Sequence, residues 1–150
     1  MQNWNVYLSG EIHTDWREQI ERGAKEQNLP VAFLSPVTDH ASSDDCGVVI
    51  LGAESDAFWK DQKGARVNAI RTRTLIERSD VVVVRFGDKY RQWNAAFDAG
   101  YAAALNKPLI TLHDEALTHA LKEVDGAALA VTQTPAQVVH VLRYAIQGEL

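Results

Sequence analysis

The stretch of sequence that decides the fold is SDVVVVRFGDKYRQWNAAFDAGYAAALNKPL, residues 79–109. Its four consecutive valines, Val81–Val84, are β-branched residues without polar alternation. This pattern predicts a strand that is covered on both faces, as in a parallel sheet. A polar loop is expected over Phe86–Trp93, after which Asn94 caps a predicted helix that ends near Leu105. The stretch therefore predicts one strand–loop–helix unit of a parallel α/β fold.

Outward from this stretch, short apolar runs alternate with longer helical patterns, which is typical of βαβ units. Thr134 and Gln137 form a predicted capping box for the last helix, with Pro135 at its first position. The expected strands are Trp4–Leu8, Val31–Leu34, Val81–Val84, Leu109–Leu112 and an edge strand over Ala128–Val131. The expected helices run from Thr14 or Asp15 to about Gln27, from about Asp61 to Arg78, from Asn94 to about Leu105, from the cap Asp114 to Gly126, and from Pro135 onward.

Residues 35–65 are rich in Asp, Ser, Gly and Lys, and they interrupt the alternation for longer than an ordinary loop does. Within them Val48–Leu51 could form a short strand, and this assignment is left open. The segment around Trp59 is long enough to fold over a site as a lid. In the helix that follows, helical spacing places Ile70 on the inward face, and the same spacing makes Phe97 more typical of core than of a ligand contact.

About five parallel strands with helices on both faces predict an α/β fold, a Rossmann- or flavodoxin-like three-layer sandwich with a roughly five-stranded parallel sheet. Right-handed crossovers and the usual doubly wound order place the first and third strands side by side at its centre. We expect residues 1–150 to form a single domain, since no repeat or domain boundary is recognisable.

The composition narrows the class of protein. Apolar residues make up 46% of the chain and charged residues 23%, which are values of an ordinary globular domain. A net charge of −5 lacks the basic field that nucleic-acid polymers need, so we expect a small-molecule partner. The single cysteine, Cys46, suits a reducing compartment. We expect no signal peptide, because the first residues lack a cationic stretch and an apolar run, and no eighteen apolar residues follow one another anywhere in the sequence. A cytoplasmic protein without membrane contact is expected.

Several familiar site motifs are missing from the sequence. The five histidines show no zinc spacing, so we expect no metal site. Neither GxGxxG nor GxxxxGK[ST] occurs, which removes the main support for a dinucleotide cofactor or a P-loop. No GxSxG motif is present for a nucleophilic serine.

Ligands of open α/β sheets bind at the carboxyl ends of the strands, where the winding direction reverses. Two loops are expected to meet there, one after the first strand (residues 9–13) and one after the valine strand (residues 85–94). The second mixes cations, aromatics and amides, which is unusual for a mere connector. The candidate substrate-binding residues are Ser9, Gly10, His13, Trp59, Arg85, Gly87, Asp88, Lys89, Tyr90, Gln92, Trp93 and Asn94.

Asp98 is the candidate catalytic carboxylate, and it allows two interpretations. We expect it near the first turn of its helix, where a carboxylate is favoured by the helix dipole alone. The functional interpretation is that the same dipole keeps Asp98 ionised and directs it into the crevice as a nucleophile.

Residues 79–109 resemble the core signature of nucleoside 2-deoxyribosyltransferases, in which an acid on the helix is followed by Gly, an aromatic or small residue, Ala, and then Lys-Pro before the next strand. The matching residues here are Asp98-Ala99-Gly100-Tyr101-Ala102 and Lys107-Pro108. The opening VYLSG also resembles that family's first strand, whose tyrosine lies near the sugar, and Tyr7 is its counterpart. Over nearly all 150 residues the chain resembles the YtoQ-type family of this superfamily.

The resemblance implies that a carboxylate attacks the anomeric carbon and holds the sugar covalently while bases exchange, as in retaining glycosidases. Asp98 occupies the position of the family's glutamate and is one methylene shorter. Asp88, Asp80 or His13 is then the source of a proton for the leaving base. The resemblance further implies that no cofactor is used and that the chain forms a homo-oligomer.

The leading hypothesis is therefore an enzyme that cleaves or exchanges the N-glycosidic bond of a nucleoside or nucleotide. Asp98 is its nucleophile, Tyr7 positions the carboxylate, and Trp93 or Tyr90 stacks on the base. A close variant is a nucleoside 5′-monophosphate N-glycosidase, in which His13, Arg85 and Lys89 hold the phosphate. The alternative from another class is a non-catalytic nucleotide-binding or sensing module.

Overall fold

The structure is a computed structural model that describes residues 2–150. Its strands are β1 (Trp4–Gly10), β2 (Val31–Leu34), β3 (Val81–Phe86), β4 (Leu109–His113) and β5 (Ala130–Thr132). Its α-helices are α1 (Trp16–Glu26), α2 (His40–Leu51), α3 (Ala57–Arg78), α4 (Trp93–Ala104), α5 (Lys122–Ala127) and α6 (Pro135–Gln147), with a 3₁₀ turn η1 over Glu115–Leu117.

The five strands form one parallel sheet in the order β2-β1-β3-β4-β5. The prediction that the first and third strands lie side by side is confirmed, with Tyr7 paired to Val82 and Gly10 to Arg85. Since the strands are parallel, their carboxyl ends share one edge of the sheet, and the chain reverses its winding direction between β1 and β3.

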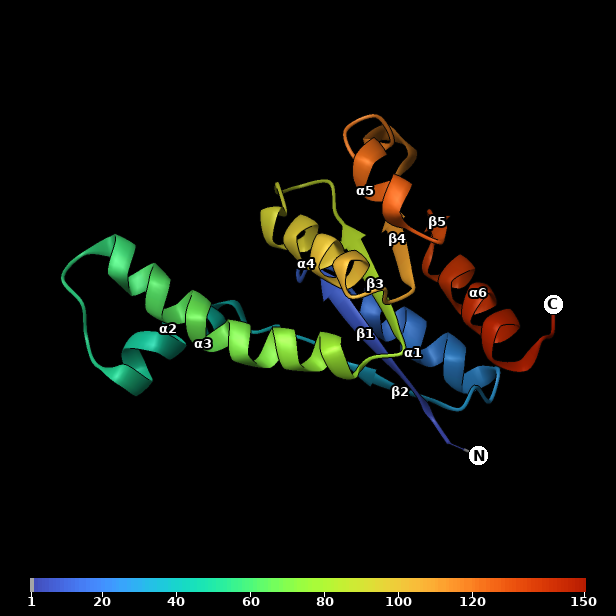
Figure 1. Cartoon of the computed structure of the whole chain (residues 1–150), viewed down its shortest axis with the longest axis horizontal. Helices are drawn as coiled ribbons and strands as arrows, with labels where there is room; N and C mark the ends of the chain where they lie inside the picture. The colour runs from blue at the N-terminus through green and yellow to red at the C-terminus, as the bar shows by residue number, and fades with distance from the viewer. Residues whose placement is uncertain (1) are drawn as a thin grey trace.

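Helices cover both faces of the sheet, so the predicted three-layer sandwich is confirmed (Figure 1). Strand alternation sends Val6 and Leu8 to the face covered by α1 and α6. It sends Tyr7 to the opposite face, where α3 and α4 pack. Successive side chains of the central strands therefore belong alternately to two separate hydrophobic cores.

The long polar insert is not a loop. It contains α2 and the first half of α3, which pack against each other and project from the sheet as a helical hairpin (Figure 1). The segment Val48–Leu51, which could have been a strand, is the last turn of α2. The two helices approach closely at Gly47, where an added Cβ would lie 2.4 Å from the Gly64 nitrogen.

Three further expectations are corrected. Asn94 does not cap α4, because the helix begins at Trp93 with Gln92 in the cap position. The single helix expected from Asp114 to Gly126 is divided into η1 and α5; Asp114 does cap η1 through the Ala116 N–H. Ile70 is 72% exposed, because α3 buries Ile76 against the sheet instead. Local periodicity does not reveal which stripe of a helix meets its neighbour.

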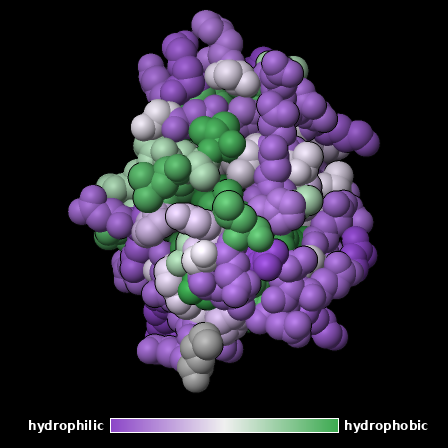
Figure 2. Space-filling model, turned by 90° about the vertical axis from the view of Figure 1, so that its right-hand side faces the viewer, coloured by the Kyte–Doolittle hydropathy of each residue, from purple (hydrophilic) through white to green (hydrophobic). Residues whose placement is uncertain are grey.

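The side of the molecule that carries the sheet's open edge is partly apolar. Figure 2 views it from the right-hand side of Figure 1 and shows apolar side chains gathered within a hydrophilic surface. On the edge strand β5, Val131 is exposed, and Leu129 just before the strand is exposed as well. Among residues 2–150, no helix is both long and apolar enough to cross a membrane.

Candidate active site at the carboxyl ends of β1 and β3

The centre of the candidate site is a contact between β1 and α4. Ser9 ends the buried part of β1, and its hydroxyl donates a hydrogen bond of 2.6 Å to Oδ2 of Asp98. Asp98 lies in the second turn of α4, not the first, so the helix dipole contributes little to its charge. Its side chain is partly buried and has no ion pair with any described residue. The carboxylate is thus held by one hydroxyl and otherwise uncompensated.

This environment changes the acidity of the carboxyl group. Burial raises the pKa of Asp98 to about 6, and the hydrogen bond from Ser9 acts in the opposite direction. The group remains largely ionised at neutral pH and becomes protonated in mildly acidic solution. A charged carboxylate near a sheet edge is available as a nucleophile or a base.

Tyr7 lies two residues before Ser9 on the same face of β1. Its side chain is completely buried, and its hydroxyl lies beside Thr72 without forming a hydrogen bond of ordinary geometry to any described residue. Burial raises the pKa of Tyr7 to about 12, with a further contribution from the charge of Asp98, so the phenol keeps its proton. A buried polar atom without a well-formed hydrogen bond is rare in folded proteins, and such groups often occur at functional sites.

Glu11 organises the loop after β1, and the sequence analysis missed it. Its carboxylate accepts hydrogen bonds from the backbone of His13 and from both the N–H and the hydroxyl of Thr14. Although burial acts to raise it, the pKa of Glu11 is lowered by these hydrogen bonds and by the nearby charge of Arg85. No sequence motif marks such a residue, because its partners are mostly backbone groups.

Arg85 is directed away from Asp98. Its position in β3 places it on the α1 face with Val81 and Val83, opposite the face of Asp98. There its Nε lies 3.6 Å from Oε2 of Glu11. The structure therefore places Arg85 with Glu11, not beside the Asp98 carboxylate.

The loop after β3 is closed by its own residues. Gln92 accepts a hydrogen bond of 2.7 Å from the Gly87 N–H. An added Cβ at Gly87 would lie 2.6 Å from Cγ of Glu11, so a side chain at this position would displace Glu11. Gln92 and Gly87 thus shape the loop and tie it to the loop after β1.

The rim of the site is aromatic and polar. The rings of His13 and Tyr90 are in contact, with centroids 4.7 Å apart, so the two loops meet as expected. Trp93 is 71% exposed at the start of α4. The exposed candidates on this rim are His13, Asp88, Lys89, Tyr90, Trp93 and Asn94.

Two other candidates lie away from this rim. On α3, Thr72 is the residue whose hydroxyl is close enough to influence Tyr7. Trp59 lies 13 residues before Thr72 on the same helix, which is a distance of about 20 Å along the helix axis. Asp80 stands before β3, at the amino edge of the sheet, where it accepts a hydrogen bond from the Asn5 N–H. Neither can meet a ligand at Asp98 of the same chain.

The side chains that α3 offers are partly engaged elsewhere. Arg71 donates to the carbonyl of Ser35, and Asn68 donates to the carbonyl of Ser43. Thr72 remains beside the Tyr7 hydroxyl. Helix α3 therefore supplies Thr72 to the site and uses Arg71 and Asn68 to hold the insert.

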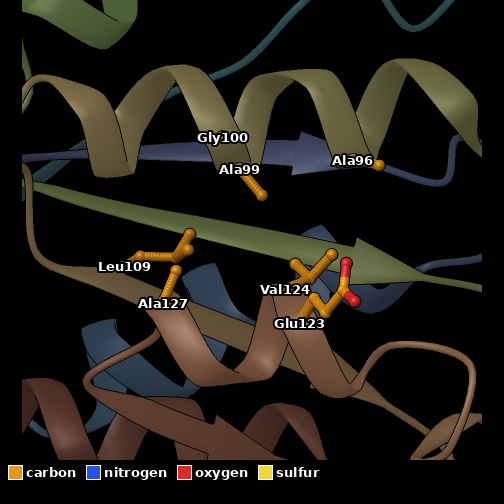
Figure 3. Close-up of a pocket in the computed structure, with 7 residues that line it drawn as sticks. All are labelled: Ala96, Ala99, Gly100, Leu109, Glu123, Val124 and Ala127. Carbon is orange, nitrogen blue, oxygen red and sulfur yellow. The ribbon is translucent and has the colours of Figure 1, made fainter.

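Two cavities lie near the site without including Asp98. One, of about 200 Å³, lies between α4 and α5 and is lined mainly by small residues of α4 and by side chains of α5 (Figure 3). The other, of about 250 Å³, lies between α1 and the segment after β2 and contains Arg17 and Glu18. Within residues 2–150, no three His, Cys, Asp or Glu side chains form a cluster suited to a metal ion.

The fold is shared with solved structures. A conserved protein from Enterococcus faecalis V583 matches with a TM-score of 0.63 and 15% identity, over 95% of this chain and 99% of that chain. The 2-deoxyribosyltransferase from the psychrotolerant bacterium Bacillus psychrosaccharolyticus matches with a TM-score of 0.52 and 16% identity, over 92% and 95%. The chain therefore shares its fold with these two proteins.

Sequence similarity is more specific. The family model described as nucleoside 2-deoxyribosyltransferase YtoQ matches residues 7–146. The uncharacterized protein YtoQ of Bacillus subtilis strain 168 is 42% identical over 144 residues, which cover 96% of this chain and 97% of that protein. The chain belongs to the YtoQ family, as its sequence motifs predicted.

Proposed function

We propose that the protein cleaves or exchanges the N-glycosidic bond of a nucleoside or nucleotide, with Asp98 as the nucleophile. The observation that carries this proposal is a partly buried carboxylate beside an unpartnered tyrosine hydroxyl, at the carboxyl ends of the two central strands. Membership of the YtoQ family supports a nucleoside as the substrate class.

In the proposed reaction a carboxylate oxygen of Asp98 attacks the anomeric carbon of the sugar through an oxocarbenium-like transition state. The bond from that carbon to the base nitrogen breaks, and its electron pair leaves with the base. A second base, or water, then displaces Asp98. If the acceptor is a base the protein is a transferase, and if the acceptor is water the protein is a hydrolase.

The surrounding residues take separate roles in this proposal. The Tyr7 hydroxyl lies near Asp98 and donates to the bound sugar or to the carboxylate. Tyr90 and Trp93 on the exposed rim stack on the base. His13 and Asp88 are the candidate proton donors to the leaving base, and Lys89 is the candidate phosphate contact. Trp59 has no role in a site formed within one chain, because it lies too far from Asp98 along α3.

Chromatography of reactions with a panel of nucleosides, nucleoside 5′-monophosphates and free bases tests the proposal. Base exchange indicates a transferase, and base release without an acceptor indicates a hydrolase. Asp98→Ala should abolish either activity, whereas Asp80→Ala, at the opposite edge of the sheet, should retain it. Ligand-induced thermal stabilisation without any product across the panel would instead support a binding module.

We also propose that the chain is a cytoplasmic homo-oligomer. Exposed apolar side chains on α3 and α4 support self-association, because Ile70 and Phe97 are each at least 60% exposed. Phe97, expected in the core, is part of this surface. Sedimentation of the wild type and of Phe97→Glu tests the assembly, since a charge at an apolar interface should dissociate it. A monomeric wild type would contradict the proposed assembly. Cell fractionation tests the proposed cytoplasmic location.

A further inference from the structure

Of the two hydroxyl groups that β1 presents to α4, only one contacts Asp98. The Ser9 hydroxyl is completely buried and donates to Oδ2, whereas the Tyr7 hydroxyl has no partner among residues 2–150. Ser9 is paired in register with Val84 of the central strand β3, so its oxygen is held by the sheet rather than by a loop. The two hydroxyls therefore have different roles.

A serine hydroxyl has one proton to donate, and here Oδ2 receives it. Among the described residues, Oδ1 of Asp98 accepts no hydrogen bond. The hydrogen bond makes the two carboxylate oxygens inequivalent and limits rotation of the carboxylate. The free oxygen keeps its lone pairs for an incoming carbon atom.

We propose that Ser9 is a positioning residue, which holds Oδ2 of Asp98 and thereby leaves Oδ1 as the oxygen that attacks the anomeric carbon. This inference rests on the proposed function of the same site. As Oδ1 forms its bond to the carbon, the carbon–nitrogen bond breaks and its electron pair leaves with the base, which takes up one proton. Displacement of Oδ1 by the acceptor base or by water returns the carboxylate to its hydrogen bond with Ser9.

The position of Ser9 matters because aspartate has a short side chain. Only one methylene separates the carboxyl group of Asp98 from the α4 backbone, so the carboxylate cannot adapt its position over a wide range. An anchor on the neighbouring strand therefore decides where Oδ1 lies. A displacement of about 1 Å from a productive geometry can reduce a rate by about 10²-fold.

A titration without substrate tests the anchor directly. The side-chain carboxyl carbon of Asp98, observed by NMR in ¹³C-labelled protein, should titrate at higher pH in Ser9→Ala than in the wild type, because the hydrogen bond that favours the ionised form is lost. Ser9→Cys, with a weakly donating thiol, should lie between the two. The matched control is Ser79→Ala, which removes an equally buried hydroxyl that donates to the Leu75 carbonyl.

Kinetics then separates positioning from binding. Ser9→Ala should lower kcat by about 10²-fold with little change in KM, and the acid side of its pH profile should move upward with the NMR titration. Ser79→Ala should leave both unchanged. If Ser9→Ala shifts the titration of Asp98 but no nucleoside is turned over, the proposed function is wrong, whereas the hydrogen bond from Ser9 to Asp98 is confirmed. If the wild type is active and Ser9→Ala alters neither the titration nor kcat, the role of Ser9 is overturned.

Discussion

Gly10 lies directly against Arg85 across the two central strands. The backbone of Gly10 has a φ of +111°, and an added Cβ would lie 2.1 Å from the carbonyl oxygen of Arg85. The N–H of the next residue, Glu11, donates to that same carbonyl oxygen over 3.1 Å. The chain can therefore leave β1 toward the site only if residue 10 has no side chain.

Gly10→Ala should destabilise the protein by more than about 4 kcal/mol, because both the left-handed backbone and the contact with Arg85 oppose a side chain. Gly52→Ala is the matched control, since Gly52 also has a positive φ, +100°, but nothing lies within 4 Å of an added Cβ. Its expected cost is about 1–3 kcal/mol, from the backbone conformation alone. Urea unfolding measures both variants, and equal losses would show that the contact with Arg85 is unimportant.

The raised pKa of Asp98 has consequences for stability. Because its pKa rises from 3.8 to about 6 in the folded protein, the folded state binds the proton more tightly than the unfolded chain does. Relative to Asp98→Asn, the wild type should lose stability as the pH rises from about 4 to about 6, and the difference should then level off. Urea unfolding of both proteins over this range provides the measurement, and a difference independent of pH would contradict it.

The activity of the proposed enzyme should change in the opposite direction. An attacking carboxylate must be ionised, so kcat/KM should fall as the pH decreases through about 6. The measurement is a pH–rate profile on whichever nucleoside is turned over. If kcat/KM decreased only near pH 4, burial would not raise the pKa of the reacting carboxyl group.

Tyr7→Phe should separate function from stability. The hydroxyl is buried without a partner, so its removal should leave the free energy of unfolding unchanged or raise it by up to about 1 kcal/mol. Catalysis should nevertheless decrease if the hydroxyl donates to a ligand or to Asp98. Thermal unfolding and steady-state kinetics together test this. A clear loss of stability would instead indicate a structural partner for the hydroxyl.

The end of β4 carries a buried hydrogen-bonded pair, His113 and Asp125. His113 is 1% exposed, its Nδ1 lies 2.8 Å from the Asp114 carbonyl, and its Nε2 lies 2.8 Å from the carboxylate of Asp125. Thr111 also donates to Asp125. Asp125→Ala should therefore cost about 3 kcal/mol, because two buried groups, the ring of His113 and the hydroxyl of Thr111, lose their hydrogen-bond partner.

The exposed pair of Arg143 and Glu149 provides the control for this prediction. Glu149→Ala should change the free energy of unfolding by less than about 0.5 kcal/mol, since both side chains are in contact with water. Comparable losses for Asp125→Ala and Glu149→Ala would show that burial of the His113 pair does not matter.

Local patterns were sufficient for the layers of the fold. Val81–Val84 predicted a buried parallel strand, and the capping box of Thr134 and Gln137 is present with both of its hydrogen bonds. These features depend on residues within a few positions of one another. The family motif around Asp98 could likewise be recognised, because its residues are contiguous in the sequence.

What required the tertiary structure is every relationship between distant segments. The sequence presents Ser9, Glu11 and Arg85 as three polar residues near strand ends. Only the packed sheet, in which alternate side chains point to opposite faces, joins Ser9 to Asp98 and Arg85 to Glu11. Helix α2 was missed for a related reason: its own residues show no apolar stripe, and its place depends on the close approach of Gly47 to α3. Periodicity reports what a segment is, whereas its partner is chosen by the geometry of the whole chain.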